Sequence, residues 1–182
     1  MNAPQPTRAR TRRMLLAALP LLLALSACAS DADTGLTLAQ TKSPVQLLRN
    51  EAASRVPAGL VAEVENSSDA SENCRTEEAD PEGLQRSWKS SVRILLTPDA
   101  DWDLVLSKFY VSFREDGWDQ GTYGSATIVE FTKDGSLATI HISGKPPKDG
   151  SAGELQVQVA GPCVMTDGEG SPEVTKLEVA TD

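Results

Sequence analysis

Residues 99–117 read DADWDLVLSKFYVSFREDG, and this stretch decides the fold. Its apolar side chains recur at intervals of three and four residues, which is the spacing of one face of an α-helix. Acidic residues stand at its start, where they favour the helix dipole, and Gly117 follows as a C-terminal cap. Residues Asp99 to Asp116 therefore predict one long amphipathic helix with the stripe Trp102, Val105, Leu106, Phe109 and Phe113.

Strand patterns flank this helix on both sides. A β-branched and apolar run from Trp88 to Leu96 precedes it. After it, Tyr123 to Thr132 and Leu137 to Ser143 are joined by an Asp-Gly link typical of a hairpin turn, and residues 155–159 alternate as a last strand. Residues 60–64 alternate in the same way. This order predicts an α+β fold with two layers, in which the long helix packs on a mainly antiparallel sheet of four to five strands.

A short N-terminal helix is predicted from Ser43, an N-cap residue followed by Pro44, to Val56. A helix of this length is marginal in water and needs a surface to cover. Leu104 and Val111 lie on the back of the long helix, about opposite its stripe. We therefore expect the short helix to pack there, and if both residues are exposed instead, they become candidates for a partner-binding patch. The stripe available for this packing is Val45, Leu48, Ala52 and Val56.

The N-terminus has the layout of an export signal. Four arginines precede an uncharged apolar run over residues 14–27, which is shorter than the roughly 20 residues that cross a bilayer. Arg12 and Arg13 are adjacent, so the twin-arginine route stays open beside the ordinary one. Residues 1–27 are predicted to be a signal peptide.

The signal ends in Leu25-Ser26-Ala27-Cys28, which resembles the lipobox of bacterial lipoproteins. The resemblance implies a diacylglycerol on the Cys28 sulfur, cleavage before this residue, and acylation of the new amine by a fatty acid such as palmitate. It implies a protein held by lipid at the extracytoplasmic face of the cell membrane. A plain cleavage site with an incidental cysteine is the alternative.

The remaining chain is predicted to contain one domain. Residues 28–42 are small and polar and predict a flexible tether, residues 43–165 form the α+β domain, and the acidic residues 166–182 predict a mostly disordered tail. The layout of residues 88–159, including the step Asp116-Gly117-Trp118, resembles small uncharacterised lipoproteins of high-GC Gram-positive bacteria. That resemblance carries no catalytic residues over.

The net charge limits the classes of partner, and the cysteines predict a disulfide. Loss of the signal peptide removes four of 17 basic residues and leaves 13 against 26 acids, a formal net charge of −13. Nucleic acid would repel such a chain, so we expect none as a partner. With Cys28 lipidated, Cys74 and Cys163 remain in a compartment that permits disulfides, and an even pair predicts one bridge.

Few residues suggest chemistry. His141 points to the polar side of its strand, where it is either a general base or pH-sensitive contact or an ordinary exposed residue. Trp118 follows the helix cap and is either a lid on the core or a ligand-stacking ring. A zinc site lacks ligands, and the acids at 99–103 fail the EF-hand pattern, because Leu104 and Tyr110 occupy its glycine and glutamate positions. No metal or other cofactor is expected.

The sequence therefore predicts a non-catalytic lipoprotein of the cell envelope. Its domain is expected to bind an envelope protein or another cell-wall component through residues among Leu104, Val111, Trp118 and His141. The alternative is a carrier or chaperone for a small ligand, with a pocket between helix and sheet. An enzyme ranks third, because no nucleophile elbow, phosphate-binding loop or dinucleotide fingerprint is present.

Overall fold

The computed structural model describes residues 35–122, 128–148 and 151–179. The predicted signal peptide, residues 28–34 of the predicted tether with Cys28, and residues 123–127 of a predicted strand lie outside these ranges. Within them the fold is α+β with a mainly antiparallel sheet, as predicted. The elements in chain order are α1 (Leu38–Ser54), the 3₁₀ turn η1 (Ala58–Leu60), β1 (Val61–Asn73), β2 (Gln85–Leu96), α2 (Trp102–Glu115), β3 (Asp119–Thr122), β4 (Ile128–Thr132), β5 (Thr139–Lys145), β6 (Glu154–Ala160), β7 (Val164–Met165) and α3 (Pro172–Val179).

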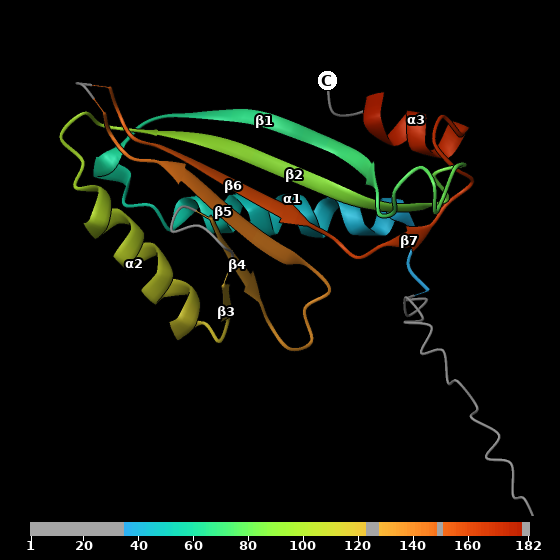
Figure 1. Ribbon diagram of the computed structural model, residues 1–182, viewed down its shortest axis with the longest axis horizontal. Coiled ribbons are helices and arrows are strands. Elements are labelled where there is room, and N and C mark those ends of the chain that lie inside the picture. Colours follow the sequence, from blue (N-terminus) through green and yellow to red (C-terminus); the bar gives the residue numbers. More distant parts are fainter. Residues whose placement is uncertain (1–34, 123–127, 149–150, 180–182) are drawn as a thin grey trace, which may run out of the picture. The chain divides into compact units, whose positions relative to one another are not determined.

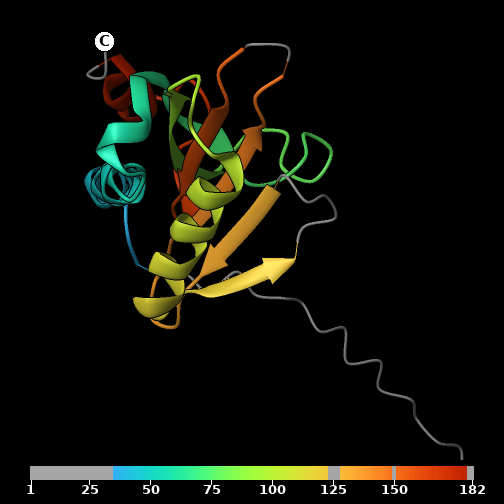
Figure 2. The ribbon, with the colours of Figure 1, turned by 90° about the vertical axis from the view of Figure 1, so that its left-hand side faces the viewer.

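The sheet is larger than the four to five strands expected. Its described part has seven strands in the order β1-β2-β6-β5-β4-β3, with β7 paired to the start of β2. All of these pairs are antiparallel. Figures 1 and 2 show α1 and α2 on the same face of this sheet, and none of the described helices lies on the other face.

The covered face holds one continuous core. Alternate residues of β2, including Trp88, Ile94 and Leu96, are buried there, as are the apolar residues of β5 and β6. Phe109 and Phe113 of α2 meet this face with no exposed surface. The strand period of two and the helix period of 3.6 therefore direct their apolar sides into the same space.

The long helix forms, but it begins at Trp102 with Asp101 as its N-cap, and not at the predicted Asp99. Gly117 follows its end in the left-handed conformation. Trp102 opens the helix and lies over the β5–β6 end of the sheet, where a Cβ on Gly144 would collide with its ring. A glycine is required at this position because the indole approaches the strand backbone so closely.

The short helix differs from its prediction in both its start and its partner. It begins at Leu38 behind the N-cap Thr37, whose side chain forms a capping box with Gln40, so Pro44 lies inside the helix. The predicted tether of residues 28–42 is therefore too long. The helix packs on β2 and β6 and not on the back of α2, and the expected helix-on-helix packing is wrong.

Two parts of the chain that were not predicted to be a helix or a strand are ordered elements. Asp119–Thr122 form the edge strand β3, which pairs with β4 through the register Asp119↔Thr132. Residues 172–179 form the helix α3, in which Val174 is buried and Lys42 Nζ donates to the Leu177 carbonyl at 2.6 Å. The domain therefore extends past residue 165, and the predicted disordered tail is corrected to a docked helix.

The disulfide prediction is confirmed. Cys74 and Cys163 are bonded, and their Cα atoms are 6.1 Å apart. The bond joins the end of β1 to the segment between β6 and β7. Beside it, the Asp80 carboxylate accepts hydrogen bonds from the backbone N–H groups of Gln85 and Leu84, which hold its pKa below the ordinary value.

Candidate functional site

The open face of the sheet carries a row of polar side chains around His141. The strand registers place Ser91, Gln158, His141 and Glu130 side by side across β2, β6, β5 and β4. His141 is therefore on the solvent side of its strand, as the alternation predicted. This row contributes hydrogen-bonding groups to a sheet face that none of the helices in the described ranges covers.

His141 has a carboxylate neighbour on the next strand. Its Nδ1 lies 3.6 Å from Glu130 Oε2, and the two side chains are 31% and 25% exposed. This separation is longer than a hydrogen bond and suits an ion pair when the imidazole is protonated. The pair makes His141 a cross-strand contact on this face of the sheet.

Trp118 closes one end of the core. The residue is 7% exposed, and its ring stands edge-on to Phe113, with centroids 6.1 Å apart and planes at 90°. Lys133 Nζ lies over the Trp118 ring, 6.0 Å from its centroid. The structure favours the lid interpretation over ligand stacking, because most of the ring surface is already in contact with protein.

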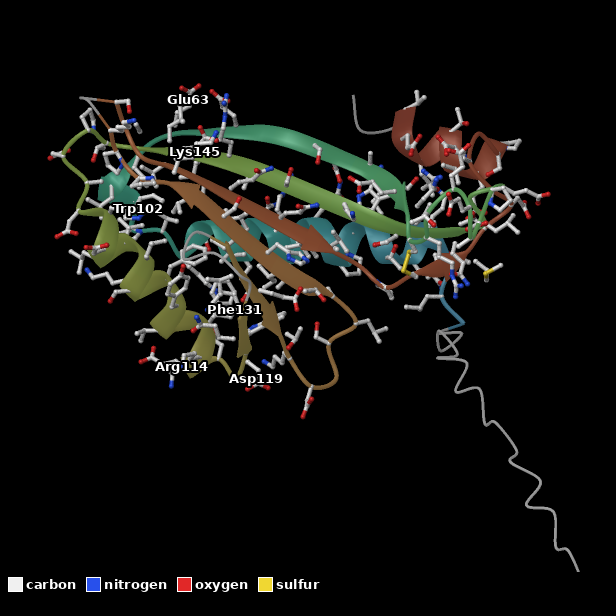
Figure 3. The ribbon with its side chains drawn as sticks, in the orientation of Figure 1. Glu63, Trp102, Arg114, Asp119, Phe131 and Lys145 are labelled. Carbon is white, nitrogen blue, oxygen red and sulfur yellow. A yellow bond between two sulfur atoms is a disulfide. The ribbon has the colours of Figure 1, made fainter. Side chains whose placement is uncertain are left out.

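Aromatic rings form a cluster where α2 meets the sheet. Phe113 stacks on Phe131 with centroids 4.6 Å apart and meets Phe109 at 5.2 Å. Tyr110 packs against Phe131 at 6.0 Å, and its burial raises the pKa of the phenol. Figure 3 shows Phe131 between α2 and the sheet. These rings pack together where the described parts of α2 and β4 meet.

Leu104 and Val111 are exposed on the outer side of α2. Their exposed fractions are 43% and 49%. Seven large apolar side chains are exposed among the described residues, and α2 is the only described element that carries two of them. Since Leu104 and Val111 are exposed and not covered by the short helix, they are the candidates for partner contact that the sequence named for this case.

Charged and small residues surround this apolar pair. We call the exposed side of the helix the α2 outer face, and Figure 3 shows one of its residues, Arg114, directed away from the strands. A shallow depression beside Val111 is lined also by Arg114 and Glu115. The helix period places these residues beside Leu104 and Val111, although neither was predicted from the sequence to be a contact residue. The α2 outer face consists of Asp103, Leu104, Ser107, Lys108, Val111, Arg114 and Glu115.

Two polar clusters in the domain are structural. Arg86 is buried, donates from Nε to Ser71 Oγ at 2.8 Å, and lies 3.6 and 3.9 Å from the carboxylates of Glu169 and Glu178. These contacts hold the C-terminal segment against β1 and β2. The second cluster is centred on Arg55, which joins the C-terminal ends of α1 and α2.

Other kinds of site find no support in the described part of the chain. Within those ranges, no three His, Cys, Asp or Glu side chains gather closely enough to hold a metal ion. None of the described helices combines the length and apolar character needed to cross a membrane. No family model, curated protein or solved structure shows significant similarity to this chain.

Proposed function

We propose that this protein is a lipid-anchored, non-catalytic binding module of the cell envelope, and that it contacts its partner through the α2 outer face. The observation that carries the binding role is the exposed pair Leu104 and Val111. Solvation of two apolar side chains on one helix face is unfavourable, and covering them with a partner removes that surface from water.

The membrane anchor is supported by the sequence Leu25-Ser26-Ala27-Cys28 and by the apolar run before it. Fully extended, the chain from Cys28 to the start of α1 at Leu38 reaches at most roughly 36 Å. A lipid on Cys28 would therefore keep α1 close to the bilayer. The disulfide between Cys74 and Cys163 agrees with a domain in an oxidising compartment.

Replacing Cys28 by alanine tests the anchor. We expect the Cys28→Ala protein to leave the membrane fraction or to accumulate as a longer precursor, because the sulfur that receives diacylglycerol is absent. Fractionation and intact-mass measurement check this result. The matched control is Ser26→Ala, which keeps a small residue in the motif and should remain bound to the membrane. A membrane-bound Cys28→Ala product of mature mass would contradict the lipoprotein proposal.

A photo-crosslinking amino acid on α2 tests the binding face. With benzoylphenylalanine in place of Val111, irradiation of whole cells should give a discrete adduct of higher mass. The control carries the same probe in place of Leu47, an apolar residue of α1 that is 68% exposed but stands alone. Equal labelling from both positions, or no adduct from Val111, would count against the α2 outer face as the contact surface.

A further inference from the structure

Buried Arg86 has more hydrogen-bond donors than the domain uses. Its side chain is only 5% exposed. Of the five N–H groups of a guanidinium, three donate here, to the hydroxyl and carbonyl oxygens of Ser71 and to the side-chain oxygen of Asn73. The carboxylates of Glu169 and Glu178 lie 3.6 and 3.9 Å from its nitrogens, which is beyond hydrogen-bond distance. Within the described part of the chain, two donors of this buried cation therefore have no acceptor.

Ser71 presents its backbone to the edge of the sheet. β1 is an edge strand of the described sheet, and Cys74 N–H donates to the Gln85 carbonyl on β2. Hydrogen-bonded positions alternate along an antiparallel strand, so Ser71, three residues earlier in the same register, directs its N–H and carbonyl away from β2. Side chains pair with these groups. The Glu178 carboxylate accepts from the Ser71 N–H at 3.3 Å and from its hydroxyl at 2.7 Å, and Arg86 donates to the Ser71 carbonyl at 3.0 Å.

The helix α3, which supplies Glu178, is attached through one buried side chain and several polar contacts. Figure 1 shows it beside the end of β1. Val174 is its buried residue, the Leu177 carbonyl accepts from Lys42 Nζ, and the Glu178 side chain stays 37% exposed. A helix of eight residues is unstable alone in water, so its position depends on these contacts. They are contacts that another segment of similar composition can replace.

We infer that Ser71 and Arg86 form a carboxylate-binding site, which Glu178 of α3 occupies as an internal ligand and which an acidic side chain of a partner protein takes in its place. A carboxylate free of the helix accepts from Ser71 with one oxygen and from an unused N–H of Arg86 with the other. Charge-assisted hydrogen bonds of this kind are stronger than an ion pair at 3.9 Å. This second surface does not depend on the α2 outer face or on the lipid anchor.

The surroundings of the site define the partner segment. The chain is strongly acidic, so it repels a run of acids, and the segment carries a single carboxylate with neutral or basic neighbours. The internal ligand has this composition, with Lys176 and Leu177 directly before Glu178. Leu177 also packs against the core, so an apolar residue before the acid fills the same place. The ligand is therefore a peptide segment in which a basic, an apolar and an acidic residue follow one another.

Exchange of the Ser71 amide hydrogen measures whether Glu178 occupies the site. In Glu178→Gln, NMR should show exchange at this amide about tenfold faster than in the wild-type chain, because a hydrogen bond to a charged group is weakened. The matched control is Glu173→Gln, an equal change of charge at an exposed position of α3, which should leave the rate within about threefold of wild type. Unchanged exchange in Glu178→Gln would overturn the internal ligand.

A labelled peptide measures the site in trans on the full chain. The probe is a fluorescein-labelled peptide of residues 172–179, followed by fluorescence anisotropy. We expect it to bind the Glu178→Gln chain about tenfold more tightly than wild type, since the internal competitor is weakened. The same peptide with glutamine in place of Glu178 should bind neither chain. Acetate should displace the probe only at concentrations far above that of the peptide.

Substitutions at Ser71 separate the site from α3. Added to Glu178→Gln, Ser71→Ala should weaken peptide binding about tenfold because a hydroxyl donor is lost, and Ser71→Thr, which keeps the hydroxyl, should retain binding. Equal binding of both peptides, or equal affinity of the wild-type, Glu178→Gln and Ser71→Ala chains, overturns the inference. Displacement by acetate at the concentration of the peptide would overturn the peptide as the ligand. In each case the proposed function at the α2 outer face stands or fails separately.

Discussion

Replacing Phe113 by alanine is expected to lower the free energy of unfolding by about 3–5 kcal/mol, the range for a buried phenylalanine. The Phe113 side chain has no exposed surface and contacts the rings of Phe109, Trp118 and Phe131. Its loss leaves a cavity where α2, the sheet and the Trp118 lid meet. Denaturant unfolding followed by tryptophan fluorescence measures the change.

The same substitution also affects the link between α1 and α2. The guanidinium of Arg55 lies 4.2 Å from the centroid of the Phe113 ring, donates to the Ser112 carbonyl at 2.9 Å and pairs with Asp116 at 2.6 Å. Removing the ring deletes the cation–π contact and exposes the guanidinium. Lys108→Ala, on the solvent side of the same helix, is the control and should change stability by about 0.5 kcal/mol or less. Similar losses for both variants would show that the ring cluster does not stabilise this junction.

Elements whose own residues bury a continuous apolar stripe were predictable from the sequence. Residues 99–117 combine such a stripe with charges at both ends and a glycine cap, and the observed α2 ends within one residue of the predicted boundary at Asp116. The hairpin between β4 and β5 was predictable from the Asp-Gly pair in its turn. Gly135 adopts the left-handed conformation that this turn requires.

The two Ser-Pro steps show where local signals mislead. At residues 43–44 the step looks like a helix start, yet α1 begins six residues before Pro44 because Thr37 and Gln40 form a capping box. At residues 171–172 the same step does start a helix, and Val174 N–H bonds to Ser171 Oγ. The start of each helix goes with the burial of one apolar residue near it, Leu38 in α1 and Val174 in α3. The periodicity of a short segment does not predict which of its residues the rest of the fold will bury.

The candidate site also has a part that was predictable from the sequence and a part that was not. The exposed positions of Leu104, Val111 and His141 could be inferred from helix and strand periods, because these periods fix the side of an element on which a residue lies. Whether another segment covers that side depends on tertiary packing. The outer side of α2 stayed open because α1 has its own place on β2 and β6, a choice that the two helix stripes alone did not determine.

Removing the disulfide is the second large expected effect. Serine in place of both Cys74 and Cys163 should lower the free energy of unfolding by about 4–5 kcal/mol in the chain-entropy model, since the bond spans 89 residues, although measured losses range from about 2 to 5 kcal/mol. Most of the sheet, including β2 and β6, lies within that span, so the unfolded chain gains much freedom when the bond is absent.

Unfolding in the presence of reductant distinguishes stability lost with the disulfide from stability lost because serine packs differently from cysteine. Wild-type protein unfolded in the presence of reductant should approach the stability of the Cys74→Ser, Cys163→Ser variant, whereas the variant itself should not respond. The single variant Cys74→Ser should be as unstable as the double variant, because either substitution breaks the same bond. The closure of β1 against β2 at this end also depends on Arg86 and Asp80, whose hydrogen bonds do not involve sulfur. A variant that keeps wild-type stability would therefore mean that these contacts alone suffice, and that the 89-residue span contributes little to folding.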